Sequence, residues 1–157
     1  MPDSDLWSAG GVVAFLGSFT HRMDDKGRLT LPAKFREQLA GGVMVTRGLD
    51  RCLSVYLPAD FNEVALKATS STSKVDEGAR SYLRLLFSGT EELVPDAQGR
   101  ISLGPKLREY AGLSKTCVVN GVVDHLEIWD EQMWEQYNRA HEESFSRGTN
   151  PALGAIL

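Results

Sequence analysis

Apolar and polar residues alternate with a period of two at two places in the chain, RLTLP at 28–32 and RISLG at 100–104. This alternation is typical of a short strand with one buried face. Each strand begins at the arginine of an Asp-x-x-Gly-Arg turn, and a proline follows at a position that suits the first turn of a helix. The segments after the strands predict helices that end at a glycine in the left-handed conformation. They are AKFREQLA at 33–40, ending at Gly41, and KLREYA at 106–111, ending at Gly112.

The pattern after each short helix predicts a hairpin and then a longer helix. Two runs of β-branched and apolar residues flank a turn that contains glycine and aspartate, at 43–57 and again at 117–129. In the first half the longer helix is expected to continue from 58 through a Ser/Thr-rich stretch to 89. In the second half it follows Asp130, a predicted N-cap. The apolar stripe of this last helix indicates packing in the core or between subunits, and it consists of Met133, Trp134, Tyr137 and Phe145.

The two halves of the chain are copies of one unit. When Gly27 and Arg28 are placed over Gly99 and Arg100, seven of the fourteen positions from 24 to 37 are identical. One inserted residue extends the match through the hairpin, which gives a repeat of about 72 residues and indicates an internal duplication. We expect an N-terminal extension at 1–14, a first repeat at 15–68, a connecting segment and helix at 69–88, a second repeat at 89–146 and a C-terminal tail at 147–157. The extension is either disordered or the result of a start codon assigned too early.

Neither copy has enough short strands to close a stable sheet alone, and a small open sheet leaves edges unpaired. We therefore expect an α+β, β-rich fold with flanking helices. In that fold the two copies interleave their hairpins and form one small barrel.

The bulk composition indicates a folded, water-soluble chain. Of the 157 residues, 42% are apolar and 24% are charged, which is the balance of ordinary globular domains. No apolar run approaches the roughly 20 residues that cross a bilayer, so we expect no membrane span. Cys52 and Cys117 lie in apolar strands without a partner at metal-ligand spacing, and we expect both to be reduced core residues.

The formal net charge of −4 argues at first against a nucleic-acid partner, because phosphate recognition needs local positive charge. The charges are segregated, however. Residues 19–39 carry five basic and three acidic side chains, whereas residues 124–143 carry seven acidic side chains and one arginine. We therefore expect one basic face and one acidic face.

The segment FLGSFTHRMDDKGRLTLPAKFR at 15–36, with its partial copy in the second half, resembles the MraZ family of bacterial transcriptional regulators, relatives of the AbrB-type DNA-binding domain. The resemblance covers nearly the whole chain. It implies a swapped-hairpin barrel built from two AbrB-like repeats and a ring-shaped homo-oligomer. It also implies a cytoplasmic, nucleoid-associated protein that binds direct repeats in the promoter of its own cell-division and cell-wall gene cluster, generally as a repressor.

The Asp-x-x-Gly-Arg turn suits a nucleic-acid surface, because glycine permits the backbone angles, aspartate binds turn amides and arginine projects a rigid donor fork. A local ion pair between the aspartate and the arginine is the alternative reading of the motif. The predicted DNA-binding residues are Arg28, Lys26, Arg22, Arg100, Lys34 and Arg36. The predicted turn-structural residues are Asp24, Gly27, Asp96 and Gly99. Since Gln98 replaces Lys26 in the second copy, we expect the first copy to contribute more to DNA binding.

The lysines and arginines of the two short helices, at 34, 36, 106 and 108, either extend the basic surface or form its solvated face. We predict no catalytic residue, cofactor, metal or small-molecule substrate, because no nucleophile elbow, phosphate loop or ligand spacing is present. One alternative function stays open at this point. The chain could be an oligomeric interaction or scaffold protein that docks a partner through its acidic C-terminal half.

Overall fold

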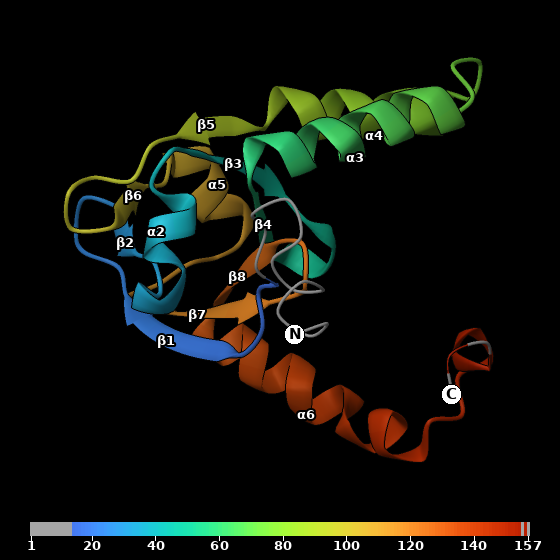
Figure 1. Cartoon of the computed structure of the whole chain (residues 1–157). Coiled ribbons are helices and arrows are strands. Elements are labelled where there is room, and N and C mark those ends of the chain that lie inside the picture. Colours follow the sequence, from blue (N-terminus) through green and yellow to red (C-terminus); the bar gives the residue numbers. More distant parts are fainter. Residues whose placement is uncertain (1–13, 155, 157) are drawn as a thin grey trace, which may run out of the picture.

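The computed structural model describes residues 14–154 and residue 156, and within them the chain adopts an α+β fold (Figure 1). The expectation for residues 1–14 falls, apart from Ala14, outside the described residues. In the first copy the elements are β1 (Ser18–Arg22), β2 (Arg28–Thr30), a 3₁₀ turn (Ala33–Phe35), α2 (Arg36–Leu39), β3 (Val43–Arg47), a 3₁₀ turn (Leu49–Arg51), β4 (Leu53–Tyr56) and α3 (Pro58–Ser71). They are followed by α4 (Glu77–Ser88), β5 (Glu91–Leu93), β6 (Arg100–Ser102), α5 (Pro105–Tyr110), β7 (Thr116–Gly121), β8 (Leu126–Asp130), α6 (Glu131–Arg147) and a 3₁₀ turn (Pro151–Leu153).

Strands from both copies form one antiparallel six-stranded sheet with the order β1-β7-β8-β4-β3-β5. Strand β1 of the first copy pairs with β7 of the second, and β5 of the second copy pairs with β3 of the first. The two predicted hairpins are confirmed as β3–β4 and β7–β8, and they join through β4 and β8 in the middle of the sheet. The copies therefore share one sheet.

The predicted closed barrel is not confirmed. Among the described residues the sheet is open between its edge strands β1 and β5, and β2 and β6 form a separate two-stranded ribbon. Beyond its edge strand each copy enters its Asp-x-x-Gly-Arg turn, and the short strand that follows pairs with the equivalent strand of the other copy. The residues that would extend the sheet toward closure are therefore used in the ribbon.

The core lies between the sheet, the ribbon and the short helices. Leu29 on β2 and Ile101 on β6 are both fully buried, whereas their neighbours along each strand are partly or fully exposed, which confirms the predicted period of two. Phe35, at the end of the first 3₁₀ turn, contacts Phe15 and Phe19 edge to face at ring-centroid distances of 5.0 and 5.5 Å. These contacts fix the first copy's helical segment against β1 and Phe15, which precedes it.

The left-handed helix end is confirmed in one copy and wrong in the other. Gly112 follows α5 with a φ of 59°. In the first copy Gly42, with a φ of 131°, carries the positive angle in place of Gly41. The amide of Gly42 donates to the Leu39 carbonyl at 3.1 Å, so the chain turns one residue later than the sequence predicted.

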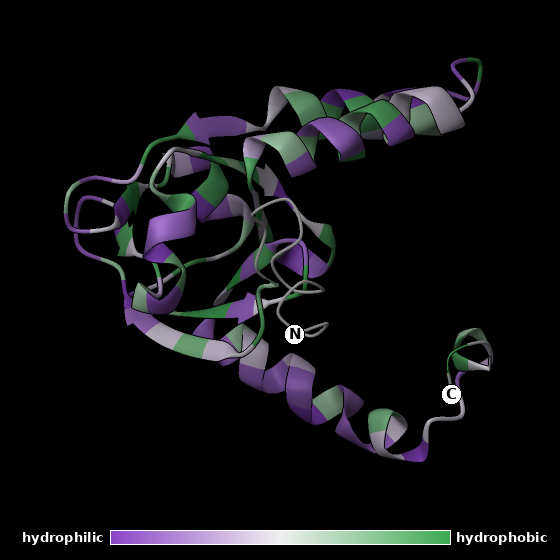
Figure 2. Ribbon diagram, in the orientation of Figure 1, coloured by the Kyte–Doolittle hydropathy of each residue, from purple (hydrophilic) through white to green (hydrophobic). Residues whose placement is uncertain are grey.

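The predicted long helix of the first copy is two helices. Helix α3 ends at Ser71 because Thr72 adopts extended backbone angles, and α4 begins after Asp76, whose carboxylate accepts hydrogen bonds from the amides of Gly78 and Ala79. Figure 1 shows α3 and α4 side by side, projecting from the sheet. In Figure 2 hydrophobic and hydrophilic residues intermingle along both helices, and every residue of the two is at least partly exposed.

Helix α6 begins as predicted at Asp130, whose carboxylate accepts from the Met133 amide at 3.4 Å. Its first two turns cover a second, smaller apolar cluster. The members of that cluster are Cys52, Val118 and Trp129, with Met133, Trp134 and Tyr137 packed against them. Phe145 at the far end of the helix is 86% exposed. The predicted stripe is thus partly core and partly surface.

Both cysteines are free and buried. Burial raises the pKa of Cys52 to about 12 and that of Cys117 to about 11. A thiol with so high a pKa is a poor nucleophile at neutral pH. The cysteines therefore act as small core residues, as expected from the sequence.

Candidate nucleic-acid interface

The first Asp-x-x-Gly-Arg turn is organised around the carboxylate of Asp24. One oxygen accepts hydrogen bonds from the backbone amides of Lys26 at 3.0 Å and Arg28 at 2.9 Å. The other oxygen accepts from Nε of Arg28 at 2.6 Å. Gly27 has a φ of 78°, which a residue with a β carbon rarely adopts. The five residues from Asp24 to Arg28 thus fix both the turn and the position of the arginine Nε.

The second turn repeats this geometry almost bond for bond. Asp96 accepts from the amides of Gln98 and Arg100, both at 2.9 Å, and from Nε of Arg100 at 2.8 Å. Gly99 has a φ of 77°. The exchange of Lys26 for Gln98 leaves the backbone geometry unchanged, because only the amide of that residue takes part. The two turns are therefore structural equivalents that differ in charge.

Hydrogen bonds to the ionised form lower the pKa of both carboxyls below their usual value. For Asp24 the strongest cause is the backbone amide of Arg28, and the Arg28 side chain and charge act in the same direction. For Asp96 the amide and side chain of Arg100 have the same effect. Both carboxylates are therefore ionised at neutral pH and hold their arginines in place.

These ion pairs orient the arginines more than they stabilise the fold. The side chains of Arg28 and Asp24 are 34% and 35% exposed, and those of Arg100 and Asp96 are 28% and 39% exposed. A solvent-exposed ion pair contributes little to stability, because water screens the two charges. The carboxylate binds Nε, which leaves the terminal guanidinium nitrogens of each arginine for other partners.

The register of the ribbon puts both arginines on one face. Arg28 lies opposite Ser102, and Arg100 lies opposite Thr30. Side chains at alternate positions of a strand share a face, and the intervening Leu29 and Ile101 are buried on the other side. The outer face of the ribbon therefore carries one arginine from each copy, placed diagonally across the strand pair.

An open hollow of about 370 Å³ lies over this face. It is lined by Arg22, Met23, Asp24, Asp25, Arg28, Thr30, Arg100 and Lys115. Four cations thus face two carboxylates, one of which is already paired with Arg28. We call this feature the basic hollow. It combines the end of β1, the first turn, the ribbon and the residue before β7.

Lys115 is a member of the basic hollow that the sequence analysis missed. The amide of Met23 donates to the Lys115 carbonyl at 2.7 Å, and the neighbouring pair Arg22 and Thr116 is the last of the β1–β7 ladder. The interleaving of copies predicted from the duplication could have suggested that the start of β7 lies near the end of β1. The register between β1 and β7 that makes the contact cannot be predicted from either segment alone.

The other predicted cations lie apart from the hollow lining. Lys26 is exposed on the first turn, and Lys34 is exposed beside the first 3₁₀ turn with its ammonium 5.8 Å from the centroid of the Phe35 ring. Arg36 lies over Gly99 of the second turn. The structure therefore brings together Arg22, Arg28 and Arg100 from the predicted set.

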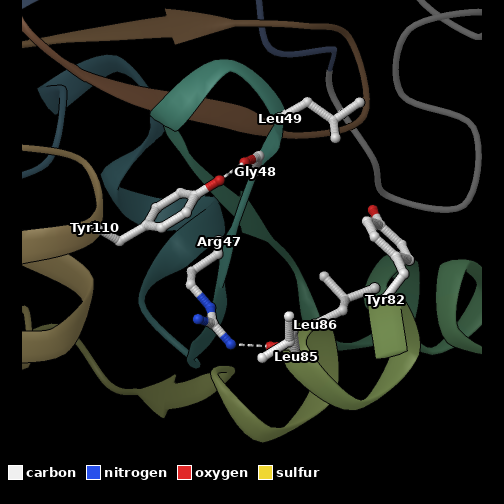
Figure 3. Close-up of a pocket in the computed structure, with 7 residues that line it drawn as sticks. All are labelled: Arg47, Gly48, Leu49, Tyr82, Leu85, Leu86 and Tyr110. Atoms are coloured by element: carbon white, nitrogen blue, oxygen red, sulfur yellow. Dashed lines mark hydrogen bonds between the residues drawn. The ribbon is translucent and has the colours of Figure 1, made fainter. Parts of the chain in front are cut away.

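A smaller pocket of about 150 Å³ lies between the β3–β4 turn and α4 (Figure 3). Leucine and tyrosine side chains dominate its lining, and two of its polar side chains are hydrogen-bonded to the backbone. Arg47 donates to the Leu85 carbonyl, and the Tyr110 hydroxyl donates to the Gly48 carbonyl at 2.5 Å. Arg47 is the one cation in its lining, against four in that of the basic hollow. In the described part of the chain no cluster of three or more histidine, cysteine or acidic side chains could hold a metal ion, and no helix is long and apolar enough to span a membrane.

The cations of the basic hollow suit a polyanion. A guanidinium held through Nε can bind a phosphate, or the O6 and N7 atoms of guanine, with its remaining nitrogens. Two such groups on one face, flanked by Arg22 and Lys115, could engage neighbouring phosphates of one strand or a phosphate and a base edge. This chemistry is that of anion recognition.

Comparison with known proteins agrees with the duplication and the motif. The sequence model of the family described as "MraZ protein, putative antitoxin-like" matches the chain twice in succession, at residues 14–84 and 86–155. This confirms the internal repeat, while the exact repeat boundaries predicted from the sequence stay a prediction.

The relatives that match the chain include proteins named "Transcriptional regulator MraZ". The one from Mycobacterium avium is 56% identical over 143 residues, which cover 91% of this chain and 99% of the relative. The relatives from Rhodococcus opacus and Mycobacterium bovis are 55% and 54% identical over the same length, with the same coverage. The chain belongs to the MraZ family.

Proposed function

We propose that the chain is a DNA-binding transcriptional regulator whose basic hollow is the DNA contact surface. The observation that carries this proposal is the convergence of Arg22, Arg28, Arg100 and Lys115, from both copies, around one open hollow on a chain whose net charge is −4. Local positive charge against a negative background is what orients an acidic protein on DNA. The relatives' name, transcriptional regulator, supports the same function.

Within this proposal the residues have different roles. Arg28 and Arg100 read phosphates or guanine edges, with Asp24 and Asp96 holding their Nε atoms. Arg22 and Lys115 supply phosphate contacts at the rim of the hollow, and exposed Lys26 adds one more in the first copy. Lys34 lies farther along the same half of the chain as a flanking phosphate contact. No catalytic step and no cofactor belongs to this function.

We further propose the finer features that the sequence resemblance implies. They are a cytoplasmic, nucleoid-associated ring of identical subunits, binding to direct repeats in the promoter of its own cell-division and cell-wall gene cluster, and repression of that cluster. The exchange of strands between the two copies supports a swapped-hairpin subunit of barrel-like shape. A ring that presents several basic hollows could bind several promoter repeats at once, and each later contact would be effectively intramolecular.

Replacing Arg28 with alanine tests the DNA contact. A bidentate arginine contact with a base is worth roughly 1–3 kcal/mol, so Arg28→Ala should weaken specific binding about tenfold or more. Assembly should be unchanged, because the side chain lies at the surface of the turn. Gel shifts with a DNA fragment from upstream of the gene measure binding, and light scattering measures assembly.

Arg139→Ala is the matched control, since this exposed arginine lies on α6 in the acidic half of the chain. It should bind DNA like the wild type. If Arg28→Ala also retained wild-type affinity, the DNA site would lie elsewhere, and the acidic half would become the leading candidate for a protein partner.

A further inference from the structure

Each Asp-x-x-Gly-Arg turn is covered by an arginine from the other copy. A β carbon built on Gly27 would lie 2.7 Å from Nε and 2.9 Å from Cζ of Arg108, which belongs to α5 of the second copy. A β carbon on Gly99 would overlap the guanidinium of Arg36, which belongs to α2 of the first copy. Both glycines are buried. The guanidinium groups thus rest directly on the backbone of the turns.

Hydrogen bonds tie each of these arginines to the strand that holds the opposite turn. Nε of Arg108 donates to the Leu103 carbonyl at 3.1 Å, while the Leu103 amide donates to the Gly27 carbonyl at 3.0 Å. In the same way a terminal nitrogen of Arg36 donates to the Leu31 carbonyl at 3.4 Å, and the Leu31 amide donates to Gly99 at 2.9 Å. Each turn is therefore held from two sides by one segment of the other copy.

The two arginines are packed as planar groups and are not engaged as paired charges. In the part of the chain that the structure describes, the ion pairs at 4.0 Å or less include neither Arg36 nor Arg108. Nε of Arg36 is buried and makes no hydrogen bond. Lysine would keep the charge but could not cover a glycine with a flat group or offer the same fork of donors.

We propose that Arg36 and Arg108 are positioning residues that fix the two turns relative to each other, and so set the placement of Arg28 and Arg100 across the basic hollow. The effect of these two arginines on DNA binding rests on the proposed function, whereas their effect on the turns does not. The proposal gives Arg36 a different role from the direct DNA contact that its sequence position suggested. The proposal also predicts that loss of the arginine in one copy loosens the turn of the other copy.

Amide hydrogen exchange in the free protein, without DNA, tests whether each arginine holds the turn of the other copy. The amides of Gly27 and Arg28 are hydrogen-bonded within the first turn, and those of Gly99 and Arg100 within the second. Arg108→Ala should speed exchange about tenfold at Gly27 and Arg28 while the second turn stays close to wild type. Arg36→Ala should do the reverse.

Lys106→Ala and Lys34→Ala are the matched controls, because these lysines are exposed and lie two residues before the positioning arginines. They should leave both turns unchanged. Arg108→Lys and Arg36→Lys are the conservative variants, and each should show the same turn-specific effect as alanine in a fully folded protein. Faster exchange in the same copy's turn, in both turns equally, in core strands as well, or nowhere would overturn the proposal.

The salt dependence of DNA binding separates positioning from contact. Removing a phosphate contact lowers the slope of log K against log salt by about 1. A positioning residue should instead lower the affinity several-fold at every salt concentration and leave the slope at its wild-type value. A reduced slope for Arg36→Ala and Arg108→Ala would make both arginines DNA contacts and would overturn the positioning role. If Arg28→Ala had no effect on DNA binding, the proposed function would fail while the exchange experiment would still stand.

Discussion

Gly99 lies where a larger residue is excluded for two independent reasons. Its φ of 77° belongs to the region that glycine adopts readily. In addition, the guanidinium of Arg36 occupies the space that a β carbon would need. The first reason is local to the turn, whereas the second arises only when the two copies pack together.

Gly99→Ala should therefore lower the free energy of unfolding by roughly 1–3 kcal/mol, the usual cost of a strained backbone position, with a further loss from displacing Arg36. Gly41→Ala is the matched control, because a β carbon there would have no neighbour within 4 Å. Urea denaturation of the two variants beside the wild type measures the difference. Equal free energies of unfolding for all three proteins would mean that the turn and Arg36 accommodate the added β carbon without loss of stability.

The local hydrogen bonds of the turns could be predicted from sequence because they join near neighbours. Asp24 binds amides and a side chain only two and four residues away. Lys115 and the cover of Gly27 by Arg108 could not be predicted in this way. The place of Lys115 depends on the register between strands some ninety residues apart, and the cover of Gly27 depends on the packing of one copy on the other. The pattern of a single segment contains neither kind of information.

At the scale of elements, the predicted hairpins and strands formed where their apolar patterns are regular, and the helix prediction failed where two signals compete. The apolar pattern on both sides of residues 72–76 favours one long helix. The run of serine and threonine, together with the capping carboxylate of Asp76, favours a break. The structure shows that the break prevails, because Asp76 satisfies amides at the start of a new helix.

Strand β1 and helix α2 also interact through charge. The pKa of His21 on β1 is lowered from its usual 6.5, first by burial and then by the charge of Arg36 on α2. The unfolded chain therefore binds more protons than the folded protein between that lowered pKa and 6.5. His21 thus contributes stability that is fully present above pH 6.5 and is lost as the pH falls through this window.

His21→Gln should consequently reduce the loss of stability on acidification from about pH 7 to about pH 5. Urea denaturation at several pH values gives the free energy of unfolding of the variant and the wild type. If the free energy of unfolding of His21→Gln depended on pH as that of the wild type does, the lowered pKa of His21 would be contradicted.

At the scale of the whole molecule, the duplication gives the chain its architecture. It predicts correctly that the two copies contribute strands to one sheet, since β1 pairs with β7 and β3 pairs with β5. It does not predict whether the shared sheet closes, because closure depends on where β2 and β6 find partners. They pair with each other, which leaves the sheet open and brings the arginines of both turns to one face of the ribbon.

The basic hollow is a property of the whole molecule for the same reason. Neither copy alone assembles it: Arg22 and Arg28 come from the first copy, and Arg100 and Lys115 come from the second. The proposed DNA site therefore requires both halves to be folded together, and single-copy fragments would carry only part of it.

The most direct test is the affinity for a labelled DNA fragment from upstream of the gene, measured over a range of salt concentrations for the wild type and for the double variant Arg28→Ala/Arg100→Ala. The wild type should lose affinity steeply as salt rises, because binding releases counterions from the phosphates. The double variant should bind this fragment no better than unrelated DNA and should show a smaller slope. Salt-independent binding by the wild type, or wild-type affinity in the double variant, would contradict the assignment of the basic hollow as the DNA site.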